Sequence, residues 1–167
     1  MRHIFSSLLL IILFSSCTKE NTSKIDIYLL KSFSLTTDQT TNPFTQKISN
    51  AVLSETPFVV DQDIQFYTKS ETTFQLSRDI KDIIKNYGPD KAFAVTVDNQ
   101  PVYYGLFHPG YLSSMTIGVP TIDPIFYFNN QIKIQFVLIT GSSDLLTLDN
   151  RNDSRLINSL KTSGRLR

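Results

Sequence analysis

Few side chains in this chain of 167 residues could serve as nucleophiles or bind a metal. It has one cysteine, Cys17, and two histidines, His3 and His108. Zinc sites take three or four protein ligands, mostly from these two residue types. The sequence therefore predicts no metal site built on Cys and His and no cofactor.

One combination of residue types could support hydrolysis. His108 could act as a base, Ser113 or Ser114 as the nucleophile and Asp123 as the group that orients the base. Neither serine lies in a GxSxG nucleophile elbow, and a histidine before Pro-Gly is typical of a turn. We therefore expect a protein that is not an enzyme and has no catalytic residue, with an envelope hydrolase as the alternative.

Two carboxylates lie close together in the sequence at Asp61 and Asp63. A calcium loop needs three or more oxygen ligands and a glycine at its sharp turn, and this segment has neither. The sequence therefore predicts acids in contact with solvent at a turn.

The first seventeen residues have the pattern of a secretory signal peptide. Arg2 supplies a positive charge, residues 4–14 are apolar apart from Ser6 and Ser7, and the small residues Ser15 and Ser16 follow. The apolar run is shorter than the roughly 20 residues that a membrane-spanning helix needs. We expect residues 1–16 to be a signal peptide that is removed.

The segment LFSSC at residues 13–17 resembles the lipobox of bacterial lipoproteins, although Phe14 stands where that family usually has leucine. The resemblance implies that signal peptidase II cleaves between Ser16 and Cys17, and that the Cys17 thiol carries a diacylglyceryl group. The alkylation needs sulfur, because a thiolate attacks far better at neutral pH than a hydroxyl. Two or three acyl chains, such as palmitate, anchor a protein firmly to a membrane.

The residues after Cys17 fit a lipid anchor. Residues 18–24 are polar and form a short tether, and no intramolecular disulfide is available to a single cysteine. In the lipoprotein family an aspartate after the cysteine implies retention in the inner membrane. Thr18 is not aspartate, so the resemblance implies a cell-envelope protein at the outer membrane, exposed to the periplasm or the cell surface.

The charge balance argues against a nucleic-acid partner. The chain has 16 basic and 15 acidic residues, so the loss of Arg2 leaves 15 of each. Binding to phosphates requires a basic surface, which a neutral chain lacks unless its charges are segregated. Five basic residues do gather near the C-terminus, namely Arg151, Arg155, Lys161, Arg165 and Arg167. They could contact anionic lipid, or they could form the cationic end of a solvated final helix.

The remaining chain, residues 25–167, has the size of one domain and 41% hydrophobic residues. Alternating patterns predict strands after Ile25, around residues 51–53, on both sides of residues 69–71, as a hairpin over 92–107, and over 131–136. Two helices are expected. One begins at Ser77 and has Ile80, Ile83, Ile84 and Tyr87 on its apolar face, and the other covers 152–162. The predicted fold is α+β, an antiparallel or mixed sheet with one or two helices packed on one face.

Aromatic residues offer the best candidate for a recognition surface. Tyr103–Tyr104 and residues 126–128 are predicted to lie on strands, where adjacent rings point to opposite faces. Tyr104 and Tyr127 could then line an exposed surface that binds an envelope protein, a peptide or a sugar. The alternative is that these rings cover a helix or a neighbouring strand.

Residues 74–107 show the order strand, helix, strand, aspartate turn, strand. This order is similar to the periplasmic head of the protein-export subunit SecD, and the resemblance implies a similar local fold only. Together, the sequence predicts a membrane-anchored envelope lipoprotein with a binding, inhibitory or scaffolding role.

Overall fold

The computed structural model describes residues 23–37, 45–138 and 148–167. Ser16, Cys17 and the predicted signal peptide lie outside the described residues. The strands are β1 Ile25–Thr37, β2 Gln46–Leu53, β3 Ile64–Thr68, β4 Thr73–Leu76, β5 Ala92–Val97, β6 Gln100–Phe107, β7 Thr121–Ile122 and β8 Gln131–Gln135. The helical elements are η1 Asp61–Asp63, α1 Lys81–Ile84 and α2 Ser154–Thr162. None of the described helices is long and apolar enough to cross a membrane.

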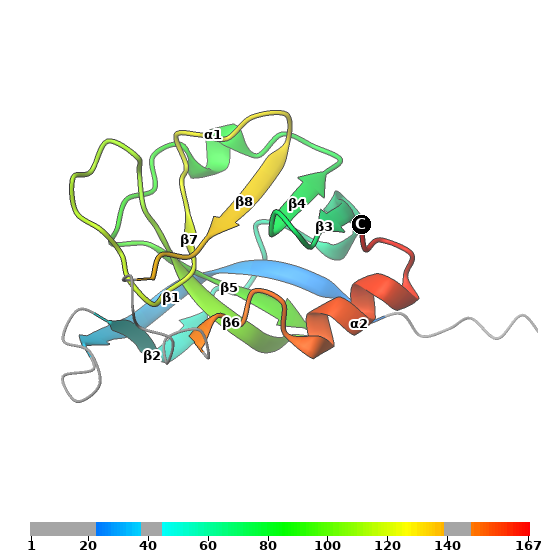
Figure 1. Ribbon diagram of the computed structural model, residues 1–167, viewed down its shortest axis with the longest axis horizontal. Coiled ribbons are helices and arrows are strands. Elements are labelled where there is room, and N and C mark those ends of the chain that lie inside the picture. The colour runs from blue at the N-terminus through cyan, green and yellow to red at the C-terminus, as the bar shows by residue number, and fades with distance from the viewer. Residues whose placement is uncertain (1–22, 38–44, 139–147) are drawn as a thin grey trace, which may run out of the picture.

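The eight strands form one mixed sheet in the order β2-β1-β5-β6-β7-β8-β4-β3. All neighbouring strands are antiparallel except β6 and β7. The sheet folds over on itself, so that β1, β5 and β6 form one layer and β8, β4 and β3 the other (Figure 1). The α+β class is confirmed.

The main core lies between these two layers. Its largest buried side chains include Tyr67, Phe74, Phe93 and Phe107. Both helices contribute to this core, through Ile84 of α1 and through Leu156 and Leu160 of α2.

The hairpin of β5 and β6 closes with a two-residue turn, as the alternating pattern predicts. Asp98 and Asn99 have φ angles of 50° and 62°, which are typical of a type I′ turn. Every residue of β5 is buried, because a second hydrophobic cluster covers its other face. Leu30, Ile48, Ala92, Ala94, Leu106 and Val119 form this second cluster.

The helix expected from Ser77 is only one turn long. It covers Lys81–Ile84 with Ile80 at its N-cap, so the prediction of a Ser77 cap is wrong. The amide of Ser77 instead donates to the carbonyl of Asp63 at 2.8 Å, so this residue is held beside η1, beyond the end of β4. Ile80 and Ile84 are buried, whereas Ile83 is 38% exposed.

The last helix follows the sequence pattern more closely. Asp153 is its N-cap, and its side chain accepts a hydrogen bond from the amide of Arg155 at 2.8 Å. Leu156 and Leu160 are fully buried, and Gly164 follows the helix with φ of +69°. This positive φ favours glycine and lets the chain turn back toward the sheet.

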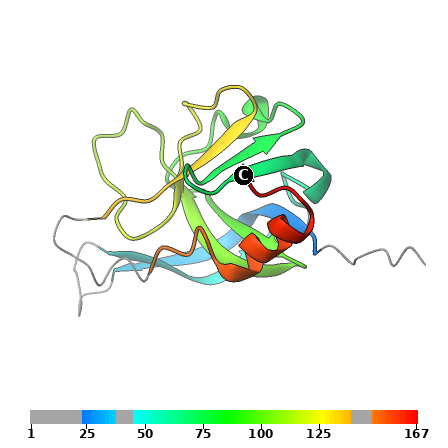
Figure 2. The same cartoon turned by 45° about the vertical axis from the view of Figure 1, so that its right-hand side comes forward.

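The C-terminal residues extend the sheet beyond β3. Tyr67 donates its amide to the carbonyl of Arg165 and accepts from the amide of Arg167, both at 2.8 Å. Figure 2 shows this segment leaving α2 and running up to β3. The outer edge of β3 is thereby covered by the protein's own chain, which protects an edge that could otherwise pair with another molecule.

Asp61 and Asp63 are structural carboxylates, so the prediction of solvated acids is wrong. Asp61 accepts from the amide of Ile25 at 2.9 Å and pairs with Arg165 at 2.7 Å. Asp63 pairs with Arg78 at 2.9 Å. Among the described residues, no group of three His, Cys, Asp or Glu side chains could hold a metal ion.

The basic C-terminus is also largely neutralised by ion pairs. Arg151 pairs with Asp149 at 2.7 Å, Arg155 with Asp153 at 3.1 Å, and Arg165 with Asp61 as described above. These arginines therefore position the last segment of the chain against the fold.

Two neighbouring carboxyls should respond to pH in opposite directions. Burial raises the pKa of Asp63, but hydrogen bonds from Arg78 and from the Val60 amide outweigh burial and hold that pKa below its ordinary value. Burial raises the pKa of Asp26, and this effect outweighs the hydrogen bond from the Asp61 amide. Ionised Asp63 thus stabilises the fold at neutral pH, and ionised Asp26 opposes it.

We expect Asp63→Asn to lower the free energy of unfolding at pH 7 by about 1–2 kcal/mol, because a charged hydrogen-bonded pair is lost. This difference should disappear as the pH falls below the ordinary aspartate pKa and through the lowered value in the fold. Asp26→Asn keeps an acceptor for the Asp61 amide and should leave stability at pH 7 unchanged or raised. Urea unfolding followed by circular dichroism between pH 3 and 7 measures both, and equal losses from the two variants would contradict this assignment.

Candidate functional site

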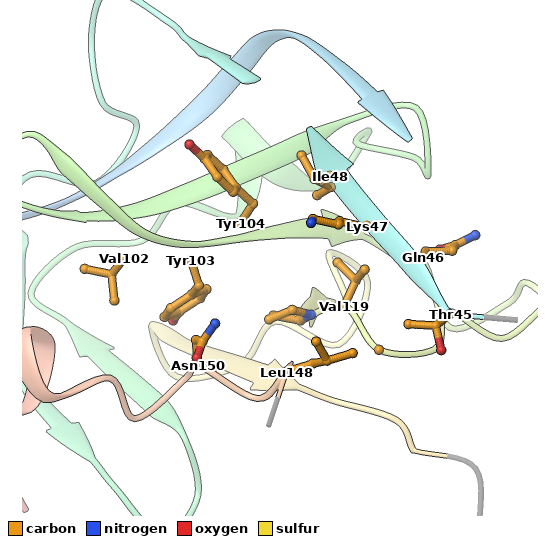
Figure 3. A pocket seen from close by; sticks show the side chains of 12 residues that line it. Thr45, Gln46, Lys47, Ile48, Val102, Tyr103, Tyr104, Val119, Leu148 and Asn150 are labelled. Carbon is orange, nitrogen blue, oxygen red and sulfur yellow. The ribbon is translucent and has the colours of Figure 1, made fainter. Parts of the chain in front are cut away.

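A groove of about 400 Å³ opens beside β6. Residues 45–48, 102–104 and 118–120 line it together with Leu148 and Asn150 (Figure 3). Its volume lies within the usual range of small-ligand pockets, about 300–1,000 Å³. We call it the β6 groove.

The groove exists because the chain before β7 turns away from β6. At Pro120 the two segments are joined, since the Leu106 amide donates to the Pro120 carbonyl at 2.9 Å. Two residues earlier, Gly118 has φ of +75° and donates its amide to Val137 at 3.1 Å. One residue before Gly118, Ile117 pairs with Thr45 next to the start of β2. The space between β6 and β2 is thus left open.

Gly118 is required at this turn for two reasons. Its positive φ is rarely adopted by residues with a side chain. A Cβ atom at this position would also lie 2.6 Å from Cγ2 of Thr45.

The wall of the groove is apolar and belongs to the second hydrophobic cluster. Ile48 and Val119 are buried there, and Tyr104 packs against the same cluster. None of the described lining residues carries a carboxylate, while Lys47 supplies a cation at an exposed position. The described part of the groove therefore has no negative charge to attract a cationic ligand.

Three buried oxygen atoms belong to residues that line this groove. They are Oγ1 of Thr45, Oε1 of Gln46 and the hydroxyl of Tyr103, and none has a hydrogen-bond partner among the described residues. Thr45 and Tyr103 are only 3% and 4% exposed. Buried polar groups are almost always paired, so three such atoms on residues that line one groove make this groove the candidate ligand site. We call them the three groove oxygens.

The Tyr103 hydroxyl is a neutral hydrogen-bonding group at physiological pH. Burial raises its pKa well above the ordinary value for tyrosine. The side chain extends from β6 toward Asn150 (Figure 3). A neutral phenol can both donate and accept a hydrogen bond.

The structure separates the two tyrosines that were predicted to share a recognition surface. Tyr104 lines the β6 groove. Tyr127 is only 4% exposed and belongs to the main core. Its hydroxyl accepts a hydrogen bond from the amide of Ile80 at 3.2 Å. Tyr127 is therefore a core residue and lines no surface with Tyr104.

The prediction of a strand over residues 126–128 is wrong for a local reason. The carboxylate of Asp123 accepts from the amides of Ile125 and Phe126 at 2.9 and 3.3 Å, which bends the chain. Phe126 and Phe128 project into solvent on either side of Tyr127. The three rings do alternate between solvent and core as predicted from the sequence. The ring that points into the core is that of Tyr127, and the rings of Phe126 and Phe128 are exposed.

The residues of the hydrolase alternative do not contact one another in the way that a catalytic triad requires. Nδ1 of His108 lies 3.1 Å from Oγ1 of Thr116, and Asp123 is engaged with backbone amides. Ser113 and Ser114 are exposed. Within the described part of the chain, no hydrogen bond joins His108 to Asp123 or to either serine. The bonds that define a catalytic triad are therefore not formed there.

Sequence reasoning identified Tyr104 and missed the rest of the groove. Thr45 and Gln46 are neighbours, but Tyr103 lies more than fifty residues further along the chain, and the three share no motif. The positive φ of Gly118 follows a loop that carries no periodic signal. The only usable hint was the pair of adjacent tyrosines on a strand.

Comparison with protein-family models, with curated proteins and with solved structures finds no match.

The two buried tyrosines Tyr103 and Tyr67 allow a matched test of the groove. The Tyr67 hydroxyl lies 3.0 Å from the carbonyl of Arg151, to which it donates, so Tyr67→Phe should lower the free energy of unfolding by about 1–2 kcal/mol. Tyr103→Phe removes a buried hydroxyl that has no described partner, and it should leave stability unchanged or raise it by about 1 kcal/mol. Urea unfolding followed by circular dichroism compares them. A larger loss from Tyr103→Phe than from Tyr67→Phe would show that its hydroxyl is satisfied inside the fold.

Proposed function

We propose that this protein is a lipid-anchored, non-enzymatic binding protein of the cell envelope that holds its ligand in the β6 groove. The observation that carries the proposal is the position of the three groove oxygens around one groove with an apolar wall. Burying an unpaired polar group costs free energy, and a ligand that supplies the partners recovers it. A binding site explains why the fold retains these groups.

The proposed anchor is Cys17 in the lipobox-like segment LFSSC, with diacylglyceryl and palmitate chains at an outer membrane, as Thr18 suggests. The domain begins close to this residue. Oγ of Ser159 donates to the carbonyl of Ser23 at 2.8 Å, and the Lys24 amide donates to Asp98 at 2.9 Å. Five residues lie between Cys17 and Ser23, so the six steps from one to the other span at most about 20 Å.

A short tether places the domain beside the bilayer with one end toward it. That end contains Ser23, the turn of β5 and β6, and α2. The Thr45–Gln46 wall of the groove lies at the other end of β1, because Gln46 pairs with Thr37. An envelope ligand could therefore reach this wall while the anchor remains in the membrane.

The anchor is tested by replacing its sulfur. Cys17→Ala should leave the precursor uncleaved and without lipid, because no thiol is available for the diacylglyceryl group. Mass spectrometry and labelling with radioactive palmitate measure both effects. Ser16→Ala is the matched control, since it keeps a small residue before the cysteine and should be cleaved and labelled. Labelling that persists in Cys17→Ala, or native protein that begins at Met1, would contradict the proposal.

The groove is tested with a variant that removes two of its oxygens and keeps its shape. Envelope membranes are solubilised in detergent and passed over the immobilised full chain. We expect at least one bound component, of any chemical class, to be retained by the wild type and lost from Thr45→Val/Tyr103→Phe. His108→Ala, outside the groove, is the control and should retain it. Equal retention by the wild type and the double variant would remove the groove from the function.

A further inference from the structure

We infer that the β6 groove binds a short, extended peptide of neutral or acidic sequence, which pairs with the backbone of β6 at Tyr104. This inference rests on the proposed function, because it names the ligand class of the same groove. It draws on the direction of the backbone groups in β6, on the three groove oxygens and on the charge of the lining.

The backbone of β6 offers hydrogen-bonding groups on the side of the groove. The amides of Leu106 and His108 donate away from β5, to Pro120 and Ile122. The amide of Phe107 points the other way and donates to Lys91. Since backbone groups alternate in direction along a strand, the N–H and C=O of Tyr104 point to the same side as those of Leu106.

Within the described residues, pairing on that side of β6 begins only at Leu106. The parallel partner β7 starts at Thr121, and Gly118 has already turned the chain away from β6. The N–H and C=O of Tyr104 thus face the groove rather than a described strand. An edge of this kind is the usual docking place for an extended peptide, whose backbone adds to the sheet.

The three groove oxygens complement the same ligand. Oε1 of Gln46 can only accept a hydrogen bond, while the Thr45 and Tyr103 hydroxyls can donate or accept. A peptide backbone presents N–H donors and C=O acceptors in alternation. A ligand with amide groups can therefore satisfy both the Tyr104 backbone and the groove oxygens.

The lining selects against positive charge. Lys47 is the charged side chain among the described lining residues, and Ile48 and Val119 provide an apolar surface for one side chain of the peptide. Neutral and acidic peptides match this lining, whereas a basic peptide would meet a like charge. The length of β6 that lines the groove, residues 102–104, corresponds to a bound segment of three or four residues.

The test uses the full lipidated chain in detergent micelles and pools of tetrapeptides with acetylated N-termini and amidated C-termini. The first pool combines Ala, Val, Ser, Thr and Asp at random. The second replaces Asp with Lys, and the third has the sequences of the first with N-methylated backbones. Retained peptides are quantified by mass spectrometry, and the amide signal of Tyr104 is followed by NMR.

We expect the first pool to be retained and to shift the Tyr104 amide signal. The N-methylated pool should bind roughly tenfold more weakly, the change expected when a buried hydrogen bond is lost. The lysine pool and the Thr45→Val/Tyr103→Phe variant should also show weaker retention. Equal binding of the N-methylated pool, or no retention of the first pool, would overturn the inference.

A neutral oligosaccharide pool, tested in parallel, separates this inference from the proposed function. If oligosaccharides bind the wild type but not Thr45→Val/Tyr103→Phe, the groove is a binding site and the peptide inference is wrong. If the envelope component described above is retained equally by the wild type and the double variant, the proposed function also fails.

Discussion

The carboxylate of Asp61 joins parts of the chain that are far apart in sequence. It accepts the amide of Ile25 at the start of β1 and pairs with Arg165 next to the C-terminus. Arg165 also donates to the carbonyl of Asp61 at 3.0 Å, so the pair is held by both side chain and backbone. The pair is partly buried, so the loss of the Asp61 carboxylate would leave the arginine charge with only neutral acceptors, such as the Asp61 carbonyl.

The rest of the folded sheet depends on this junction. With Arg165 fixed, Leu166 lies beside Tyr67 and the chain end covers β3. With Ile25 fixed, β1 enters between β5 and the segment around Val59. The two layers of the sheet are thereby connected at one end, and the aromatic side chains of the main core fill the space between them.

The groove arises from the second cluster and from the same folding of the sheet. Strand β5 is buried on both faces. The neighbouring strand β6 also has one face in the main core and the other in the second hydrophobic cluster, so Tyr103 and Tyr104 lie on opposite sides of the sheet. Because the chain turns away at Gly118, residues 102–104 of β6 lie beside the open groove. Three polar atoms are buried there without a described partner, and burying such groups costs free energy.

The sequence by itself determined most of the local elements. Alternation fixed β1, the β5–β6 hairpin and β8, because one side of each pattern must be buried and a turn residue such as Asn99 is suited to a positive φ. The sequence likewise predicted a helix over residues 152–162, where α2 covers Ser154–Thr162. The order of elements over residues 74–107 also followed the sequence, although α1 is shorter than its apolar spacing indicates.

Only the tertiary structure decided the roles of Asp61, Asp63, Tyr103 and Tyr127. The carboxylate of Asp61 is paired by Arg165, about a hundred residues away, and that of Asp63 by Arg78. Whether a tyrosine is exposed depends on which segment covers it. Ion pairs and burial depend on distance in space, so neither can be recognised from the spacing of residues along the sequence. The β6 groove was hidden from the sequence for the same reason: its walls come from four separate segments that meet only when the sheet is folded.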